Sequence, residues 1–468
     1  PALHHFQYCK RLRHPQILTV YATLDTDNPS AATNPAGGEG GGGGGGAQAS
    51  SSSSSAAAST ATTGDLIVVT EPCVSLNQWL LGNPTPEQLA WGLQCVVEGL
   101  SFLHQQANLA HGAVSPTSFY VTPSGDVKLW NFALVTPVGG PNNNAGPTPH
   151  FQQYDQACCP ETYRSPERVQ KQYASTVANG GIHAMDAFGL GILIDYWYNQ
   201  GAGGGGGGGR VPQQLVKAVQ RLQSPNPKMR PRRLQSLLTC PVFDTPYQKM
   251  QLQLQEIQIQ PVEQKVALWQ QLGTDLQNQG PNQGHGRPQK IPKDVALHKI
   301  LPLVITECQT ITNNESLLAQ DMYRREVLAM LVPLFYIMDN YQDPSKIGKD
   351  LGPLVSKLFT VPDRGVRSIL LNQVGFMTRH MDKSALNSKV FEPLCSGFND
   401  SSPVLRELTL KATLALVPSL NPPNMEKLSR YLVRLQGDSE ASIRTNAVIF
   451  IAKIAPHLSE VSKEKMLL

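Results

Sequence analysis

The stretch His111–Leu134, HGAVSPTSFYVTPSGDVKLWNFAL, decides the fold of the first half of this chain. Two short apolar runs, Phe119–Val121 and Val127–Trp130, flank the turn segment TPSGD. β-Branched and aromatic residues on both sides of a turn that contains Pro and Gly are typical of a β-hairpin. The stretch therefore predicts a loop that begins at His111 and leads into a hairpin.

The segment before this stretch predicts a strand and a long buried helix. An apolar strand is expected at Asp65–Glu71, DLIVVTE. The sequence TPEQ then marks a helix start, with Thr85 as the N-cap, Pro86 in the first position and Gln88 closing a capping box. Five apolar residues recur at helical spacing and predict one buried face. They are Leu89, Leu93, Val96, Leu100 and Leu103.

Composition favours two domains and argues against several classes of protein. A chain of 468 residues, 40% of them hydrophobic, is long for one core. The formal charge is only +4, and the longest basic run is RPRR, so no dedicated nucleic-acid surface is indicated. The eight cysteines show neither a CxxC pair nor a histidine at metal spacing, which predicts a reducing compartment without zinc or a disulfide framework. No apolar run is long enough to span a bilayer, so we expect a soluble, cytoplasmic protein.

Low-complexity segments interrupt the chain and help to place its domains. Three of them are too polar and too rich in small residues to pack, and they predict inserted surface loops; a fourth predicts a spacer between helices. They are 28–64, 139–149 and 201–209, and then the spacer 278–290. The predicted domains are 1–245 and 246–468, the second beginning where the sequence changes to Leu-rich amphipathic helices.

The second domain contains an internal repeat. The segments VPDRGVR, NDSSPVLR and GDSEASIR end at Arg367, Arg406 and Arg444, with spacings of 39 and 38 residues. Each is a polar turn that leads into an apolar helix, a pattern and period close to those of HEAT repeats. An irregular helical bundle is the alternative, but the shared phase and turn chemistry favour a solenoid. We expect the three arginines to occupy equivalent places at helix starts and to bridge to turn carboxylates such as Asp363, Asp400 and Asp438.

The order of motifs in the first domain resembles a protein kinase from the end of its small-lobe helix onward. A strand, an inserted loop, the hinge VVTEP, the capped helix, the His111 loop, a hairpin, YRSPE and DAFGLG follow one another over residues 1–245. The resemblance implies an α+β protein-kinase-like fold with an incomplete N-terminal lobe, followed by an all-α HEAT-repeat solenoid. It also implies that the chain begins after the glycine-rich loop and the strand lysine of a kinase.

This resemblance places the catalytic motifs on residues that cannot perform kinase chemistry. The catalytic loop H-R-D-L-x-x-x-N begins at His111, so that Ala113 replaces the proton-accepting Asp and Ser118 the metal-binding Asn. The D-F-G motif falls on Asn131 to Ala133, where a neutral amide replaces the magnesium carboxylate. General-base assistance is worth about 10²- to 10⁴-fold, and Mg²⁺ prefers anionic oxygen ligands. We therefore predict a protein without kinase activity, cofactor or metal.

Residues with architectural roles in kinases are retained. The resemblance implies that Glu167 pairs with Arg230 and that Asp186 holds the backbone of the His111 loop, while Gly191 belongs to the large buried helix. A further departure lies in the first helix. There, His5 occupies the place where a kinase has the glutamate that pairs with the strand lysine.

A degenerate kinase fold followed by HEAT repeats resembles the Scy-like pseudokinases, in the branch of the N-terminal kinase-like proteins. The most specific likeness lies in VFEPLCSGFNDSSPVLRELTLKATLALVPSLN and RLQGDSEASIR. The resemblance implies a scaffold in Golgi-to-ER retrograde transport, peripheral to Golgi membranes, that binds COPI coatomer and Arf-type GTPases through its solenoid. The family's C-terminal coiled coil and basic coat-binding tail are not expected in a chain that ends KEKMLL, so direct coat binding by this chain is in doubt.

Two other functions remain open from the sequence. An adaptor for nuclear export of tRNA would need a basic track with salt-dependent binding, which the modest charge does not favour. An atypical active kinase would need magnesium-dependent turnover, which the three replaced groups disfavour. The oligomeric state is not predicted.

Overall fold

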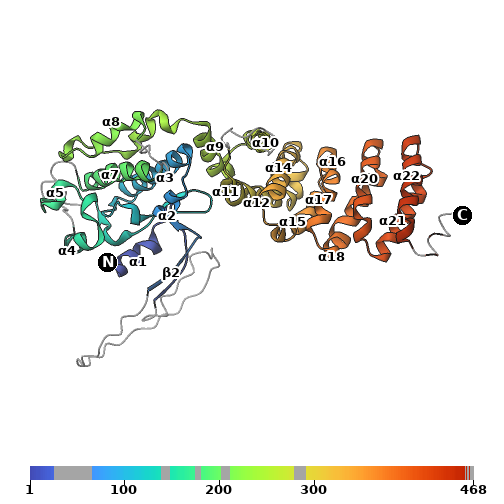
Figure 1. Cartoon of the computed structure of the whole chain (residues 1–468), viewed down its shortest axis with the longest axis horizontal. Helices are drawn as coiled ribbons and strands as arrows, with labels where there is room; N and C mark the ends of the chain where they lie inside the picture. The colour runs from blue at the N-terminus through green and yellow to red at the C-terminus, as the bar shows by residue number, and fades with distance from the viewer. Residues whose placement is uncertain are drawn as a thin grey trace, which may run out of the picture. The chain divides into compact units, whose positions relative to one another are not determined.

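The computed structural model describes residues 1–25, 66–138, 148–173, 181–201, 211–278 and 291–458, with Glu460 and Lys463. The chain divides into two compact units, Pro1–Lys249 and Met250–Leu468 (Figure 1). Each unit is described by itself below. No helix among the described residues is long and apolar enough to cross a membrane.

The predicted low-complexity segments lie almost entirely outside the described residues. A few residues at their predicted ends are described and belong to helices or their caps. The segment 28–64 is wholly outside. The predicted insert 139–149 is too long, because Thr148 caps helix α4 (Pro149–Cys158) by accepting a hydrogen bond from Phe151 N–H. A threonine followed by proline has the composition of a loop but also forms a good helix start. Similarly, Gly201 ends helix α7 (His183–Gly201), and Asn278 follows helix α10 (Val262–Gln277).

Helix α3 (Pro86–Gln105) runs through the core of the first unit. The predicted capping box is confirmed: Gln88 N–H donates to Thr85 Oγ1, and Thr85 N–H donates to Gln88 Oε1. The predicted apolar face of α3 is buried along its whole length. A Cβ atom at Gly92 would lie 2.7 Å from the ring of Trp197, so glycine lets α3 and α7 approach closely.

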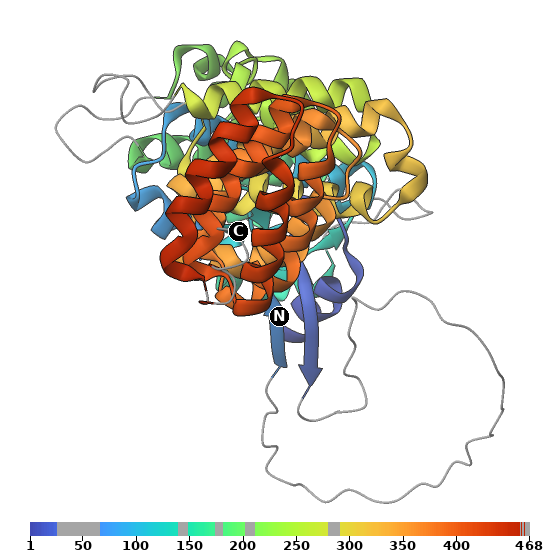
Figure 2. The ribbon, with the colours of Figure 1, turned by 90° about the vertical axis from the view of Figure 1, so that its right-hand side faces the viewer.

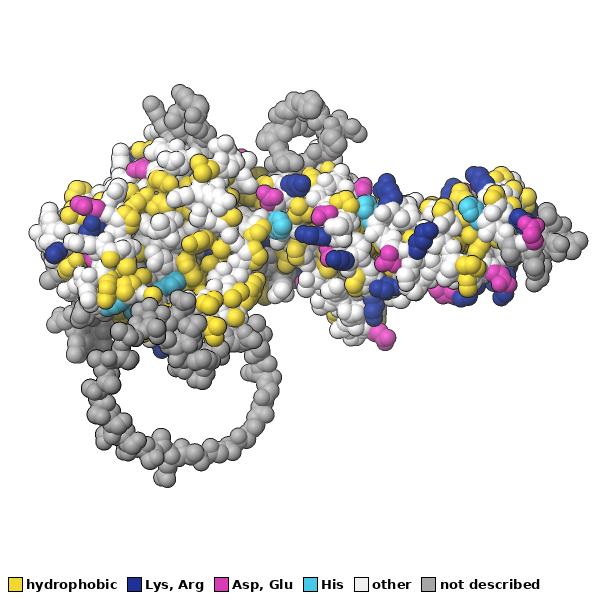
Figure 3. All heavy atoms as spheres, turned by 60° about the horizontal axis from the view of Figure 1, so that its bottom comes forward, with side chains coloured by type: hydrophobic (Ala, Val, Ile, Leu, Met, Phe, Trp, Pro, Cys, Tyr) yellow, Lys and Arg dark blue, Asp and Glu magenta, His cyan; other side chains and the backbone are white. Residues whose placement is uncertain are grey.

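The strands described in the first unit form short antiparallel pairs. The predicted hairpin is confirmed as β5 and β6, and the predicted strand at Asp65–Glu71 is β2. The β1–β2 ribbon exposes apolar side chains, among them Tyr21, Ile67 and Val69, and Figure 3 shows hydrophobic side chains gathered on this face of the unit. The pairs are β1 (Val20–Asp25) with β2 (Leu66–Thr70), β3 (Val74–Ser75) with β5 (Phe119–Val121), β5 with β6 (Val127–Leu129), and β4 (Leu109–Ala110) with β7 (Thr136–Pro137).

Short helices complete the first unit. They are α1 (Ala2–Arg11), α2 (Leu76–Leu81), α5 (Pro166–Val169), α8 (Gln213–Leu222) and the 3₁₀ turns η2 (Pro116–Ser118), η3 (Phe132–Leu134), η4 (Glu161–Tyr163), η5 (Pro227–Met229), η6 (Leu234–Thr239) and η7 (Pro241–Phe243). Gly191 on α7 lies against the end of α8, and a Cβ atom there would be 2.8 Å from Gln223. Glycine at this position is therefore required by the packing of α7 on α8.

The described part of the second unit is all helical and shares one hydrophobic core. Contacts run between successive layers, from α14 to α16, from α16 to α20 and from α20 to α22, and Figure 2 shows the last helices side by side. This arrangement confirms the solenoid over the irregular bundle. Its helices are the end of α9 (Pro246–Gln255), which begins before Met250, and α10, α11 (Lys293–Val295), α12 (Leu301–Thr312), α13 (Glu315–Leu318), α14 (Asp321–Asn340), α15 (Pro344–Leu358), α16 (Arg364–Asn372), α17 (Val374–His380), α18 (Lys383–Ala385), α19 (Phe391–Cys395), α20 (Pro403–Leu416), α21 (Pro422–Leu435) and α22 (Ala441–Ile454). Between or after them lie the π-helical segments η9 (Ala296–Ile300) and η10 (Leu386–Val390) and the 3₁₀ turns η8 (Ile257–Ile259), η11 (Ser396–Asn399), η12 (Val417–Ser419) and η13 (Ala455–His457).

Candidate functional site

Asp186 at the start of α7 holds the backbone of the loop that follows β4. Its carboxylate accepts hydrogen bonds from His111 N–H at 2.6 Å and from Gly112 N–H at 2.8 Å, and it lies 2.9 Å from His104 Nε2. The carboxylate is buried, and burial alone would raise the pKa of Asp186. The hydrogen bond from His104 and the charges and amides around it outweigh burial and lower that pKa, so Asp186 is ionised.

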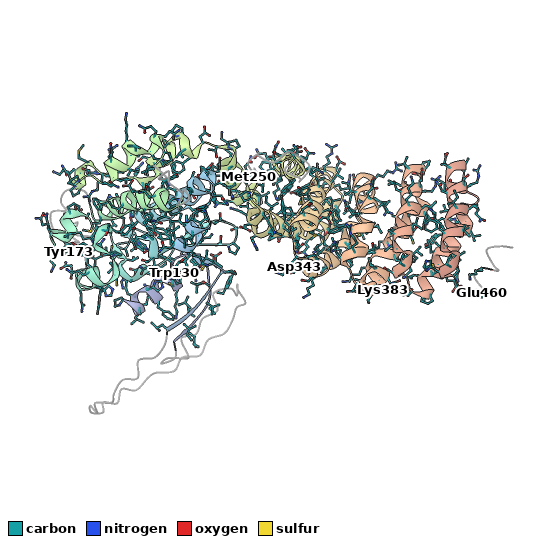
Figure 4. The ribbon with its side chains drawn as sticks, viewed as in Figure 1. Trp130, Tyr173, Met250, Asp343, Lys383 and Glu460 are labelled. Carbon is teal, nitrogen blue, oxygen red and sulfur yellow. The ribbon has the colours of Figure 1, made fainter. Side chains whose placement is uncertain are left out.

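His111 is a neutral structural residue in this loop. Its Nε2 lies 2.8 Å from the Trp130 carbonyl oxygen, which can only accept, so Nε2 carries the proton. Its Nδ1 accepts from Ala113 N–H at 3.2 Å. Complete burial lowers the pKa of His111, against the opposing effect of Asp186, and the neutral tautomer follows. The ring therefore ties the loop to the strand end at Trp130, which is labelled in Figure 4.

The three positions assigned to kinase chemistry contact one another through neutral groups. Ser118 Oγ donates to the Ala113 carbonyl oxygen and accepts from Asn131 Nδ2, which lies 3.2 Å away. Ala113 and Ser118 are fully buried. Asn131 has a left-handed backbone with φ 62°, a conformation that asparagine tolerates better than most residues. The resulting Ala113–Ser118–Asn131 chain of hydrogen bonds offers a metal ion no carboxylate.

His5 on α1 docks onto the segment that begins at Asn131. Its Nδ1 accepts from Phe132 N–H at 2.9 Å, and its ring meets Trp130 edge-on at 4.5 Å. Burial, with a smaller contribution from His111, lowers the pKa of His5 to about 4. The residue in the place of the helix glutamate is therefore a neutral hydrogen-bond acceptor. Ala133 follows Phe132 in η3, and its carbonyl oxygen lies 3.0 Å from His150 Nε2.

Gly112 is a loop residue whose role the sequence did not predict. Its φ is +76°, and a Cβ atom would lie 2.7 Å from both the Leu134 carbonyl oxygen and the Phe151 ring. Only glycine fits this backbone and this space. The side chain that a kinase carries at the second position of this loop would therefore clash here.

Glu167 and Arg230 form a bidentate ion pair, with Nη1–Oε1 at 2.6 Å and Nη2–Oε2 at 2.9 Å. Their side chains are 6% and 0% exposed, so water does not screen the pair. Burial would raise the pKa of Glu167, but hydrogen bonds from Arg230 and Ser165 lower it. Arg230 also donates to the Ser224 and Ala184 carbonyl oxygens, and so joins α5 to α7 and to the segment after α8.

A second buried ion pair links α4 and α5 and was not predicted from the sequence. Arg168 Nε donates to Asp155 Oδ1 at 2.7 Å, and both side chains are 2% exposed. Tyr173 OH donates to the other carboxylate oxygen of Asp155 at 3.0 Å, and Arg168 also donates to the Gly112 carbonyl oxygen. Neither residue belongs to a motif, and only their packing shows that they pair.

In the solenoid, each of the three repeat arginines is the fourth residue of its helix: Arg367 in α16, Arg406 in α20 and Arg444 in α22. Arg406 forms a bidentate pair with Asp438 of the next turn, at 2.8 and 2.9 Å. Arg444 donates to the backbone carbonyl oxygens of Asp438 and Ser439.

The carboxylate pairing predicted for Arg367 is wrong, and so is that for Arg444, which bonds to backbone carbonyl oxygens instead. The guanidinium of Arg367 donates to Ser396 Oγ at 2.8 Å and to the Phe359 carbonyl oxygen, whereas Asp363 accepts from Val366 N–H as the N-cap of α16. An aspartate immediately before a helix satisfies an unpaired backbone donor, and this use competes with side-chain pairing.

A fourth arginine of the same kind, Arg324, was not predicted from the sequence. Arg324 is the fourth residue of α14 and donates to the Leu318 and Ala319 carbonyl oxygens, both at 2.9 Å. Arg406 and Arg444 make the same contacts, to the carbonyl oxygens six and five residues before them. The turn before α14 lacks the aspartate–serine pair that precedes α20 and α22, so its sequence does not reveal the repeat.

Two cavities separate successive repeat turns. One of about 310 Å³ lies between the turns at Asp363 and Asp400, and one of about 330 Å³ lies between those at Asp400 and Asp438. Polar and charged residues line both, including Arg364 and Arg434. We call these two cavities and their rims the turn edge.

The fold places this chain in the class of proteins that have a kinase-like large lobe followed by a helical solenoid, as the sequence predicts. No protein-family model matches the chain. Among solved structures, the crystal structure of Cex1p is similar with a TM-score of 0.57 and 19% identity, over 98% of this chain and 73% of that one. This likeness bears on the fold alone.

Curated relatives confirm the resemblance to Scy1-like proteins. The chain is 26% identical to the probable inactive serine/threonine-protein kinase scy1 of Dictyostelium discoideum, over 86% of this chain and 46% of that protein. It is 21% identical to the mouse protein-associating with the carboxyl-terminal domain of ezrin, over 72% and 43%, and 20% identical to mouse SCY1-like protein 2, over 79% and 39%. The chain thus spans less than half the length of each of these relatives.

Proposed function

We propose that this chain is a non-catalytic kinase-like scaffold that binds protein partners along the turn edge of its solenoid. Its place of action in this proposal is Golgi-to-ER retrograde transport, peripheral to Golgi membranes, with COPI coatomer and Arf-type GTPases as partners. The observation that carries the proposal is the neutral Ala113–Ser118–Asn131 chain, which replaces the groups that kinase chemistry needs.

The loss of chemistry follows from charge and from hydrogen bonding. Phosphoryl transfer depends on metal ions that neutralise the phosphates and on a carboxylate that orients the attacking hydroxyl. In this chain Ser118 and Asn131 bond to each other, and the Ala113 side chain cannot accept a proton. The name of the Dictyostelium relative, a probable inactive kinase, supports the same conclusion.

The turn edge supports partner binding because it carries accessible charged groups beside both cavities. Arg364 is 66% exposed on the rim of one cavity, and Arg434 is exposed on the rim of the other. Figure 3 shows basic and acidic side chains interspersed over the visible face of the solenoid. Mixed charge suits a protein partner and disfavours tRNA, which binds best to a continuous basic track. The name of the ezrin-associating relative also describes binding to a protein.

Binding and transfer assays on this 468-residue chain test the proposal. We expect no transfer of labelled phosphate from Mg-ATP to the chain or to a generic peptide, together with retention of GTP-loaded Arf. Retention of coatomer as well would show that the solenoid binds the coat without the family's basic tail. The double variant Arg364→Glu/Arg434→Glu should lose most of the Arf binding. The matched variant Arg379→Glu/Arg430→Glu changes two arginines that are 64% and 74% exposed and lie outside the two cavities, and it should bind normally.

Three outcomes would contradict parts of the proposal. Phosphate transfer above background would show a surviving kinase activity. Equal binding by both double variants would remove the turn edge as the partner surface. Salt-dependent binding of tRNA without binding of coatomer or Arf would favour the export adaptor instead.

A further inference from the structure

A small basic pocket lies between α4 and α5 of the first unit. Its volume is about 140 Å³, well below the roughly 300 Å³ at which pockets for drug-sized ligands begin, so it suits a small ion and not a nucleotide. Figure 4 labels Tyr173, which lies at this site. The polar residues that line the pocket include Gln153, Gln156, Arg164, Arg168, Lys171 and Tyr173.

The carboxylate in the pocket wall is already satisfied. Asp155 accepts from Arg168 through one oxygen and from Tyr173 through the other, at 2.7 and 3.0 Å. Arg168 neutralises the charge of Asp155 in an ion pair that is almost fully shielded from water, since each side chain is 2% exposed. This pair therefore adds no net charge to the pocket.

Two further cations line the pocket, one with a weak counter-charge and one with none among the described residues. Arg164 Nη2 lies 3.6 Å from Glu161 Oε2, longer than a hydrogen bond, and Glu161 is 75% exposed, so water screens its charge. The Lys171 ammonium forms no ion pair with any residue that the structure describes. The described protein groups therefore balance the positive charge of the pocket only in part.

Arg164 also has a donor without an acceptor. Its Nε is buried and has no hydrogen-bond partner among the described residues, while the whole side chain is only 11% exposed. Buried donors in native proteins are nearly always paired, so an orphan of this kind calls for an acceptor that the protein does not itself supply. Because Arg164 lines the pocket, an anion bound there is the acceptor that we consider.

We propose that this pocket binds a phosphate-type dianion, as inorganic phosphate or as the phosphate group of a phosphorylated side chain. A guanidinium presents parallel N–H groups that match two oxygens of a tetrahedral anion, which gives Arg164 Nε its acceptor. Lys171 adds a second point charge, and two cations of which one is only weakly paired and the other unpaired suit a dianion. The pocket belongs to the kinase-like unit and does not depend on the solenoid surface proposed above.

Calorimetric titration of the full chain with inorganic phosphate and with O-phospho-L-serine tests the proposal. Both titrations are made at constant ionic strength, with L-serine and sodium chloride as negative probes. We expect saturable binding of at least one phosphate probe and of neither negative probe. In a sample with ¹⁵N-labelled arginine, the same probe should shift the Nε–H signal that Arg164→Lys removes.

Two variants and one control locate the binding. Lys171→Gln should weaken binding about tenfold, because hydrogen bonds to charged groups are worth at least that factor, and it should not disturb folding since Lys171 is exposed. Arg164→Lys keeps the charge but loses the forked donor, and we expect a similar loss. Lys217→Gln, at an exposed lysine of α8 outside the pocket, should bind as the parent does.

The probes also distinguish the two sources of phosphate. Binding of O-phospho-L-serine alone assigns the pocket to a phosphorylated side chain, and equal binding of both probes assigns it to the free ion. The proposal is overturned if neither phosphate probe saturates, if L-serine or chloride produces the same response, or if Lys171→Gln and Lys217→Gln bind equally.

Discussion

The two units of this protein organise their charged groups in different ways. In the kinase-like unit, a few buried groups join segments far apart in the chain, as Glu167 and Arg230 do with side chains 6% and 0% exposed. At the repeat turns of the solenoid, charged groups join neighbouring repeats and stay partly accessible, as Arg406 and Asp438 do at 12% and 7% exposure. When a buried long-range ion pair is broken, no neighbouring group can take over its contact. A contact at a repeat turn is one of several similar contacts, so the others remain when it is lost. Single substitutions should therefore affect the first unit much more than the second.

The largest effect is expected for Arg230→Ala. This change leaves the Glu167 carboxylate buried without its partner, which typically costs about 3–5 kcal/mol. Urea unfolding followed by circular dichroism should show a transition of the kinase-like unit at much lower denaturant concentration. The matched change Arg444→Ala, at an exposed arginine that bonds only to backbone carbonyls, should stay within about 0.5 kcal/mol. Equal effects of the two changes would remove the contrast between the units.

A smaller effect, dependent on pH, is expected from His5. Its folded pKa of about 4 lies below the ordinary value of 6.5, so the unfolded chain binds a proton between these pH values that the folded chain does not. Stability is then full above pH 6.5 and falls by about 3 kcal/mol as pH drops to 4, since each pKa unit is worth about 1.4 kcal/mol. In His5→Gln, which keeps an acceptor for Phe132 N–H but does not titrate, this part of the loss should disappear.

Unfolding free energies measured from pH 7.5 to 4.5 check the prediction for His5. The parent and His5→Gln should have similar stability at pH 7.5 and diverge below pH 6.5. Parallel curves over the whole range would show that the neutral form of His5 is not required for docking α1 onto η3.

A still smaller effect is expected in the solenoid. A double-mutant cycle on Arg406→Ala and Asp438→Ala should give a coupling of about 0.5–1 kcal/mol, because the pair is partly hydrated. The same cycle on Arg430 and Glu426, which are 74% and 52% exposed and four residues apart, should give about 0.3 kcal/mol. Coupling above about 3 kcal/mol for Arg406 and Asp438 would show that the solenoid relies on single buried contacts as the first unit does.

The smallest expected effect is that of Mg-ATP on thermal unfolding. A ligand at 100 times its dissociation constant would stabilise the protein by about 2.7 kcal/mol, which a melting experiment resolves. The neutral Ala113–Ser118–Asn131 chain has no carboxylate for the metal, so we expect no shift with millimolar Mg-ATP. An upward shift that EDTA abolishes would show that metal-dependent nucleotide binding survives in the kinase-like unit.

Local sequence signals predicted the elements whose structure depends on neighbours along the chain. The capping box at Thr85 and the hairpin around TPSGD formed as expected, because turn and cap chemistry act within a few residues. The solenoid was predictable for the same reason, since its repeat units are local and recur at a nearly constant spacing. The resemblance to Scy1-like proteins was likewise confirmed by the curated relatives; it was carried by a degenerate kinase-like domain followed by repeats and by the sequence of the last two repeats.

Contacts between distant segments were visible only in the structure. Nothing near Asp155 in the sequence points to Arg168, and nothing near His5 points to Phe132, 127 residues away. The pairing expected for Asp363 failed because the same carboxylate could cap a helix or bind an arginine, and local geometry chose the cap. The orphaned Nε of Arg164 is likewise a property of packing alone.

By itself, the sequence determined the class of fold and the absence of charged groups at the positions that kinase chemistry uses, since both follow from residue identity and order along the chain. Only the tertiary structure decided which hydrogen bonds the groups at and around those positions form. Ser118 bonds to Asn131, the His111 ring is neutral, and the Asp186 carboxylate holds the loop backbone. The physical reason is that hydrogen-bond partners, burial and pKa depend on distances between atoms that the chain brings together only when it folds.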